Sequence, residues 1–161
     1  MIMSRIDIER QKVPNGIAMP QLIICIGNSG RQDDGLGWAF ADWLEEWSGG
    51  EAKVIRRYQL QIEDAEMISH LDRVLFVDAT HEHFVTGFDV NPVRSFIEHG
   101  FSTHALEPAA IIGLCKALYG VEPEAHILAI VGSDFELRMG LTEVAKENLR
   151  RATEWFSTCV R

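Results

Sequence analysis

Residues 22–47 read LIICIGNSGRQDDGLGWAFADWLEEW and contain two structural patterns in succession. Residues 22–26 form a continuous apolar run rich in β-branched side chains, which is typical of a strand buried on both faces of a parallel sheet. From Leu36 the apolar residues instead recur at helical spacing, and Ser48-Gly49-Gly50 is expected to end this helix. Asp33 and Asp34 lie between the two patterns. Because functional sites of open α/β sheets form where strands end, this pair is a candidate for chemistry.

The rest of the chain continues this alternation of strands and helices. Strands are predicted at residues 52–60, 73–79, 88–96 and 126–131, and helices at residues 62–71, 105–119 and from 142 towards 160. The strand at 88–96 is expected at an edge, because Pro92 has no N–H for a central ladder. The pattern predicts a single α/β domain over residues 21–161, with helices on both faces of a mostly parallel sheet. Residues 1–20 are predicted to form an irregular N-terminal extension, with a short strand near residues 6–8.

Composition narrows the class of protein. The chain has 161 residues, enough for one core, and a formal net charge of −9, which disfavours a nucleic-acid partner. No apolar run approaches the roughly 20 residues that span a membrane, and the N-terminus lacks the apolar core of a signal peptide, so a cytoplasmic protein is expected. Cys25, Cys115 and Cys159 are far apart in apolar surroundings, which predicts buried, reduced thiols.

Three polar residues are expected at the carboxyl edge of the predicted sheet. Asp34 follows the first strand, Asp78 closes the strand at 73–79, and His104 precedes a helix. Two carboxylates and one imidazole suit a divalent transition metal and leave positions open for water or a substrate group. His81 and His83 lie near Asp78 in sequence, but a polar loop is the favoured interpretation of both.

Other motifs either allow two interpretations or argue against particular classes of enzyme. Asp33 either orients Asp34 or serves only the start of the helix. The sequence contains no HExxH, no GxSxG, no GxGxxG after a strand and no phosphate-binding GK[ST] loop. A zinc protease of the HExxH type, a serine hydrolase with a nucleophile elbow and a nucleotide-binding enzyme are therefore disfavoured.

Four short motifs, taken in order, resemble those of the nickel-iron hydrogenase maturation endopeptidases. They are Ile26-Gly27-Asn28 continuing through Asp33-Asp34-Gly35-Leu36-Gly37, then Phe76-Val77-Asp78-Ala79, Ser102-Thr103-His104, and Gly140-Leu141-Thr142. The resemblance spans residues 21–160. It implies a three-layer α/β/α sandwich of the phosphorylase/hydrolase-like type, in which Asp34, Asp78 and His104 match the metal-binding and catalytic positions.

The resemblance also implies an activity. Members of this family remove a C-terminal extension from the hydrogenase large-subunit precursor after nickel insertion, and they read the nickel that the substrate itself carries. The protein is thus expected to be a monomeric endopeptidase whose partner is such a precursor, with cadmium or zinc able to replace nickel in the isolated protein. Residues 57–60 lack the glycine-rich turn that some members have after the second strand.

Two other functions fit part of the sequence. Peptidyl-tRNA hydrolases have a similar sheet and an opening turn that residues 27–30 partly match, but Asp33-Asp34 occupies the region of their catalytic histidine. The net charge of −9 also opposes a tRNA substrate. A non-catalytic, nickel-sensing or chaperone-like module that binds the precursor without cutting it would use the same three ligands.

Overall fold

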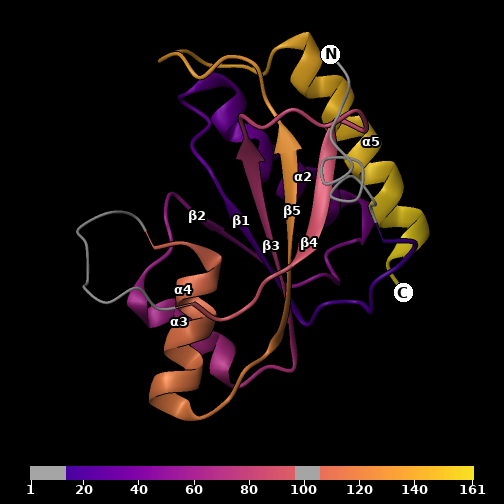
Figure 1. The fold of residues 1–161 in the computed structure, drawn as a ribbon. Helices are drawn as coiled ribbons and strands as arrows, with labels where there is room; N and C mark the ends of the chain where they lie inside the picture. The colour runs from indigo at the N-terminus through magenta and orange to yellow at the C-terminus, as the bar shows by residue number, and fades with distance from the viewer. Residues whose placement is uncertain (1–13, 97–105) are drawn as a thin grey trace, which may run out of the picture.

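Five strands form one sheet in the order β2-β1-β3-β5-β4 (Figure 1). This computed structural model describes residues 14–96 and 106–161. The strands are β1 (Leu22–Ile26), β2 (Val54–Arg57), β3 (Arg73–Thr80), β4 (Phe88–Pro92) and β5 (Glu124–Val131). All neighbouring strands are parallel except β4, which pairs antiparallel with β5 at the edge. The predictions of a mostly parallel sheet and of an edge strand at Pro92 are confirmed.

Helices cover both faces of the sheet. α2 (Leu36–Trp47) and α5 (Glu143–Cys159) pack on one face, whereas α3 (Ile62–Ser69) and α4 (Pro108–Leu114) pack on the other (Figure 1). A 3₁₀ turn, η1 (Gln32–Gly35), precedes α2, and one π-helical turn, η2 (Cys115–Tyr119), extends α4. The predicted three-layer α/β/α sandwich is therefore confirmed. None of the helices in the described ranges is long and apolar enough to cross a bilayer.

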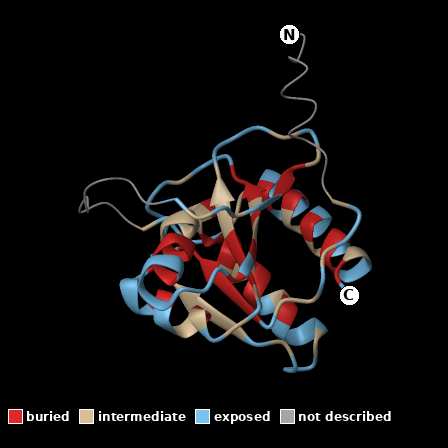
Figure 2. Ribbon diagram, turned by 60° about the horizontal axis from the view of Figure 1, so that its bottom comes forward, coloured by how far each residue is buried: buried red, intermediate tan, exposed pale blue. Residues whose placement is uncertain are grey.

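The core consists of two apolar layers separated by the sheet. Alternation along β3 directs Leu75 and Val77 towards α2 and α5, and Val74 and Phe76 towards α3 and α4. Figure 2 shows buried residues along the sheet and on the inward faces of the helices, with exposed residues on the outer faces. Cys25 and Cys115 are buried and Cys159 is half-buried, and all three are free thiols.

Several local expectations were wrong. The helical spacing of apolar residues places Ile62, Leu118 and Val144 on the faces expected to be buried, but each is more than half exposed, since all three lie close to a helix end. The strands at 52–60 and 88–96 are shorter than expected, because both are edge strands that pair on one side only. Asp78 lies within β3 rather than at its end, since the ladder to β5 continues to the pair Thr80 and Val131. The strand predicted near residues 6–8 lies outside the described residues.

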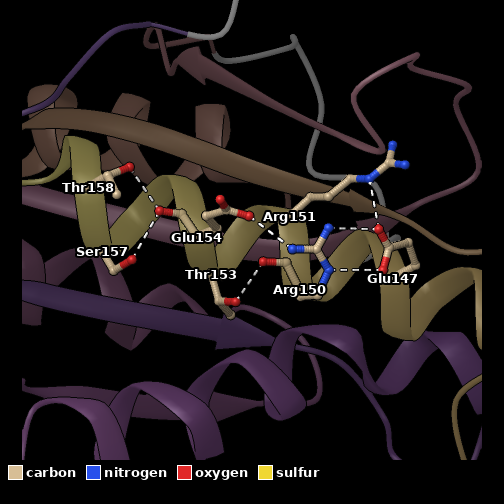
Figure 3. Close-up of polar contacts among 7 residues, drawn as sticks. All are labelled: Glu147, Arg150, Arg151, Thr153, Glu154, Ser157 and Thr158. Carbon is tan, nitrogen blue, oxygen red and sulfur yellow. Dashed lines mark hydrogen bonds and ion pairs between the residues drawn. The ribbon is translucent and has the colours of Figure 1, made fainter.

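Residues 14–17, where the described part of the chain begins, run beside the C-terminal part of α5. Ile17 N–H donates to the carbonyl of Cys159 over 3.2 Å, and Trp155 Nε1 donates to the carbonyl of Pro14 over 3.0 Å. The exposed surface of α5 carries ion pairs one turn apart, in which Arg150 and Arg151 share Glu147 (Figure 3). Such exposed ion pairs contribute little to the free energy of folding, so the fold does not depend on them.

Candidate functional site

Two close backbone contacts place the turn after β1 against the carboxyl edge of the sheet. A Cβ atom added at Gly37 would lie 2.2 Å from the carbonyl oxygen of Ile26, and one at Gly27 would lie 2.2 Å from that of Asp34. Asn28 N–H donates to the same Asp34 carbonyl over 2.9 Å. Any residue larger than glycine would push the start of α2 away from the strand ends. These glycines therefore hold Asp34 beside the end of β1.

Asp34 and Asp78 come from neighbouring strand ends and influence each other. Burial raises the pKa of Asp34, and the positive charges of Arg31 and His81 partly oppose this effect. Burial also raises the pKa of Asp78 to about 7. The hydrogen bond from Ala79 N–H, 2.8 Å long, lowers that pKa, and the negative charge of Asp34 raises it. Two of the three predicted site residues are thus brought together at the carboxyl edge of the sheet.

The third predicted site residue, His104, lies outside the described residues. His81 is exposed, and its ring lies 4.0 Å from that of Phe135, measured between centroids. Within residues 14–96 and 106–161, no three side chains of the types His, Cys, Asp and Glu are placed to hold a metal ion. The described residues therefore contain two of the three predicted site residues, Asp34 and Asp78.

Asp33 has a role that the sequence did not reveal. Its carboxylate is fully buried and accepts hydrogen bonds from the N–H groups of Ser133 (2.8 Å), Asp134 (3.1 Å) and Thr142 (2.8 Å), and from the Thr142 hydroxyl (2.7 Å). Burial alone would raise the pKa of Asp33, but these hydrogen bonds lower it below its usual value. Asp33 thus joins the turn after β1 to the loop before α5, and these long-range partners were not anticipated from the sequence.

Backbone pairing strengthens this junction. Gln32 N–H donates to the carbonyl of Arg138 over 2.9 Å, and Asp33 N–H donates to that of Asp134 over 3.0 Å. Gln32 adopts a φ of +46°, an unusual conformation for a residue other than glycine, which indicates that its surroundings fix it. The segment 132–142, which we call the Asp33-bound loop, is therefore tied to the turn that carries Asp34.

Several solved structures with the same fold are hydrogenase maturation proteases. HycI of Thermococcus kodakarensis KOD1 is 22% identical, with a TM-score of 0.64, over 96% of this chain and 97% of its own. HybD of the same genus and species is 21% identical, with a TM-score of 0.62, over 84% of this chain and 95% of its own. HybD of E. coli is 15% identical, with a TM-score of 0.64, over 84% of this chain and 88% of its own.

The class of fold follows from these matches. The chain has the fold of the [NiFe] hydrogenase maturation proteases, and the resemblance drawn from the sequence motifs is confirmed at the level of the fold. No protein-family model and no curated protein sequence matches the chain.

Proposed function

We propose that this protein is an endopeptidase that removes the C-terminal extension of a nickel-iron hydrogenase large-subunit precursor after nickel insertion. The observation that carries the proposal is the convergence of Asp34 and Asp78 at the carboxyl edge of the sheet. These two residues match the family's metal-binding positions in sequence, and here they lie near each other within the fold of known maturation proteases.

The chemistry of the site follows from an incomplete ligand set. Asp34, Asp78 and His104 are proposed to grip nickel that the precursor already carries, which leaves the other coordination positions to the precursor's own groups. Holding that nickel places the scissile peptide beside a Lewis acid that polarises its carbonyl for attack by water. The Asp33-bound loop keeps Asp34 in position while the bulky precursor docks.

A processing assay tests this function. Purified protein is mixed with a nickel-loaded large-subunit precursor and, separately, with the same precursor lacking nickel. Loss of a C-terminal peptide only from the loaded precursor, observed by mass spectrometry, is the expected result. Stable binding of the loaded precursor without cleavage would instead establish a chaperone-like module.

Three further properties remain predictions: that cadmium or zinc can replace nickel in the isolated protein, that the protein is a monomer, and that it is located in the cytoplasm.

His104→Ala is expected to abolish processing without unfolding the protein. Loss of one of three ligands weakens the binding of nickel, so the rate of processing should fall at least about a hundredfold. His70→Ala is the matched control, because His70 is an exposed histidine at the end of α3. Gel-based processing rates and circular dichroism are measured for both variants. Normal processing by His104→Ala would remove His104 from the site.

A further inference from the structure

The two most exposed large apolar side chains among the described residues belong to the Asp33-bound loop. Leu137 is 82% exposed and Met139 is 75% exposed, and only Arg138 separates them in sequence. A single exposed apolar side chain is normal on a protein surface, but two of them on one short loop indicate a surface that another molecule covers. We call Leu137 and Met139 together the apolar tip.

The backbone beneath the apolar tip is hydrogen-bonded to the turn after β1. Gln32 N–H donates to the carbonyl of Arg138 over 2.9 Å, and Gln32 Oε1 accepts a hydrogen bond from Glu136 N–H over 3.3 Å. Arg138 N–H donates in turn to the carbonyl of Glu136 over 2.8 Å. These bonds oppose any rearrangement of the loop that would bury its two apolar side chains. A surface whose backbone is already ordered loses little conformational entropy when a partner binds to it.

The loop that carries the apolar tip contacts the segments of both acids of the site. Through Asp33, the loop is bound to the turn that contains Asp34. Through Phe135, whose ring lies 4.0 Å from that of His81, the loop also contacts the segment that follows Asp78. Figure 1 shows the loop beyond the carboxyl ends of β3 and β5. A large molecule held by Asp34 and Asp78 would therefore meet this loop as well.

We propose that the apolar tip binds an apolar surface on the folded body of the hydrogenase large-subunit precursor. This inference rests on the proposed function, because it assigns a docking surface to the same site. The nickel that Asp34 and Asp78 are proposed to hold is also bound by the precursor's own groups, so the body that carries this nickel must approach the same edge of the sheet. Burial of the apolar tip adds affinity for the precursor without contact to the reacting atoms. Methionine suits such a surface, since its flexible and polarisable side chain adapts to a partner.

A double variant tests the proposal. Leu137→Gln combined with Met139→Gln keeps the approximate size of both side chains and makes them polar. The matched control combines Leu118→Gln with Val121→Gln, because both residues are exposed and lie shortly before β5, at the opposite edge of the sheet. We expect the tip variant to raise the Kd for a nickel-loaded precursor at least about tenfold, because two apolar side chains no longer favour burial. The control variant should bind as wild type does.

Kinetics separate docking from damage to the site. In the tip variant KM should rise, whereas kcat at saturating precursor should stay close to that of wild type, because only the binding of the precursor is weakened. Thermal unfolding establishes that both variants are folded. An unchanged Kd, or a fall in kcat with KM unchanged, would overturn the proposal.

Crosslinking identifies the molecule that covers the apolar tip. The photo-reactive residue benzoylphenylalanine is placed at position 137 and, as a control, at position 118. After irradiation with the nickel-loaded precursor, mass spectrometry should locate crosslinks from position 137 in the body of the precursor and none from position 118. Crosslinks from position 137 that are confined to the C-terminal extension or to a second copy of this chain would contradict the proposal, as would their absence.

Binding measurements distinguish failure of this inference from failure of the proposed function. If wild type binds the loaded precursor without cutting it, the proposed endopeptidase is wrong. In that case, a Kd that is raised by the tip variant and not by the control variant still supports the docking surface. If wild type neither binds nor cuts a panel of loaded precursors, both proposals are overturned.

Discussion

Asp78→Asn is expected to reduce precursor processing at least about a hundredfold, because a neutral amide is a far weaker ligand for a divalent metal than a carboxylate. The same substitution is expected to stabilise the folded protein at alkaline pH. The carboxyl of Asp78 is half-buried near the negative charge of Asp34, and its pKa in the folded protein is about 7. Ionising it in place therefore opposes folding.

The pH dependence of this stability difference has a defined sign. The folded state favours protonated Asp78, so this favourable contribution is complete below the unfolded pKa of about 4 and is lost as the pH rises through about 7. Wild type and Asp78→Asn should be equally stable near pH 4, and the variant should be more stable above pH 7. At pH 8 we expect a gain of about 2 kcal/mol, less than the full shift implies because the side chain is partly exposed.

Urea unfolding in the presence of a chelator, between pH 4 and pH 8.5, measures this difference. Asp72→Asn is the matched control, since Asp72 is an exposed aspartate just before β3, and its stability should follow that of wild type. A variant Asp78→Asn that is less stable than wild type at pH 8 would show that the charged carboxylate is stabilised in the fold. Such a gain in stability with loss of activity is typical of residues selected for function.

Asp33→Ala is expected to lower the free energy of unfolding by about 3 kcal/mol, since it leaves three backbone N–H groups and one hydroxyl without their buried acceptor. The Asp33-bound loop should then separate from the turn that carries Asp34. Processing is expected to fall with it through misplacement of Asp34, because the Asp33 carboxylate is occupied by hydrogen bonds from Ser133, Asp134 and Thr142.

Acid sensitivity distinguishes this effect from a simple loss of packing. The hydrogen bonds depress the folded pKa of Asp33, so its contribution is complete above the unfolded value of about 4 and is lost as the pH falls through the lower, folded value. The gap in stability between wild type and Asp33→Ala should therefore narrow below pH 4. Hydrogen exchange should also show faster opening of the N–H groups of residues 133 and 134. Unchanged exchange there, together with wild-type stability at pH 7, would contradict the role given to Asp33.

Most of the fold was predictable because it follows from local patterns. The apolar runs of β1, β3 and β5 and the helical spacing of α2 and α5 appear directly in the sequence, and the alternation of these elements determines the parallel topology. The positions of Asp34 and Asp78 followed from the same argument, since both lie near strand ends. Helix faces were less predictable near helix ends, where Ile62 and Val144 escape burial.

The remaining polar residues depend on long-range contacts that no local pattern encodes. Asp33 accepts hydrogen bonds from residues about a hundred positions later in the chain. Its role therefore could not be predicted from the sequence around it. The position of His104 relative to the two acids stays a prediction, because that residue lies outside the described ranges.

The link between Asp33 and residues 133–142 has a consequence for biosynthesis. A ribosome releases the chain from its N-terminus, so the strand β1 and the turn after it emerge long before Ser133 and Thr142. Until those residues have left the exit tunnel, Asp33 has only water as a partner and Asp34 has no fixed position. A nascent or truncated chain therefore lacks an organised site. The proposed endopeptidase would therefore acquire its activity only after residues 133–142 have been synthesised.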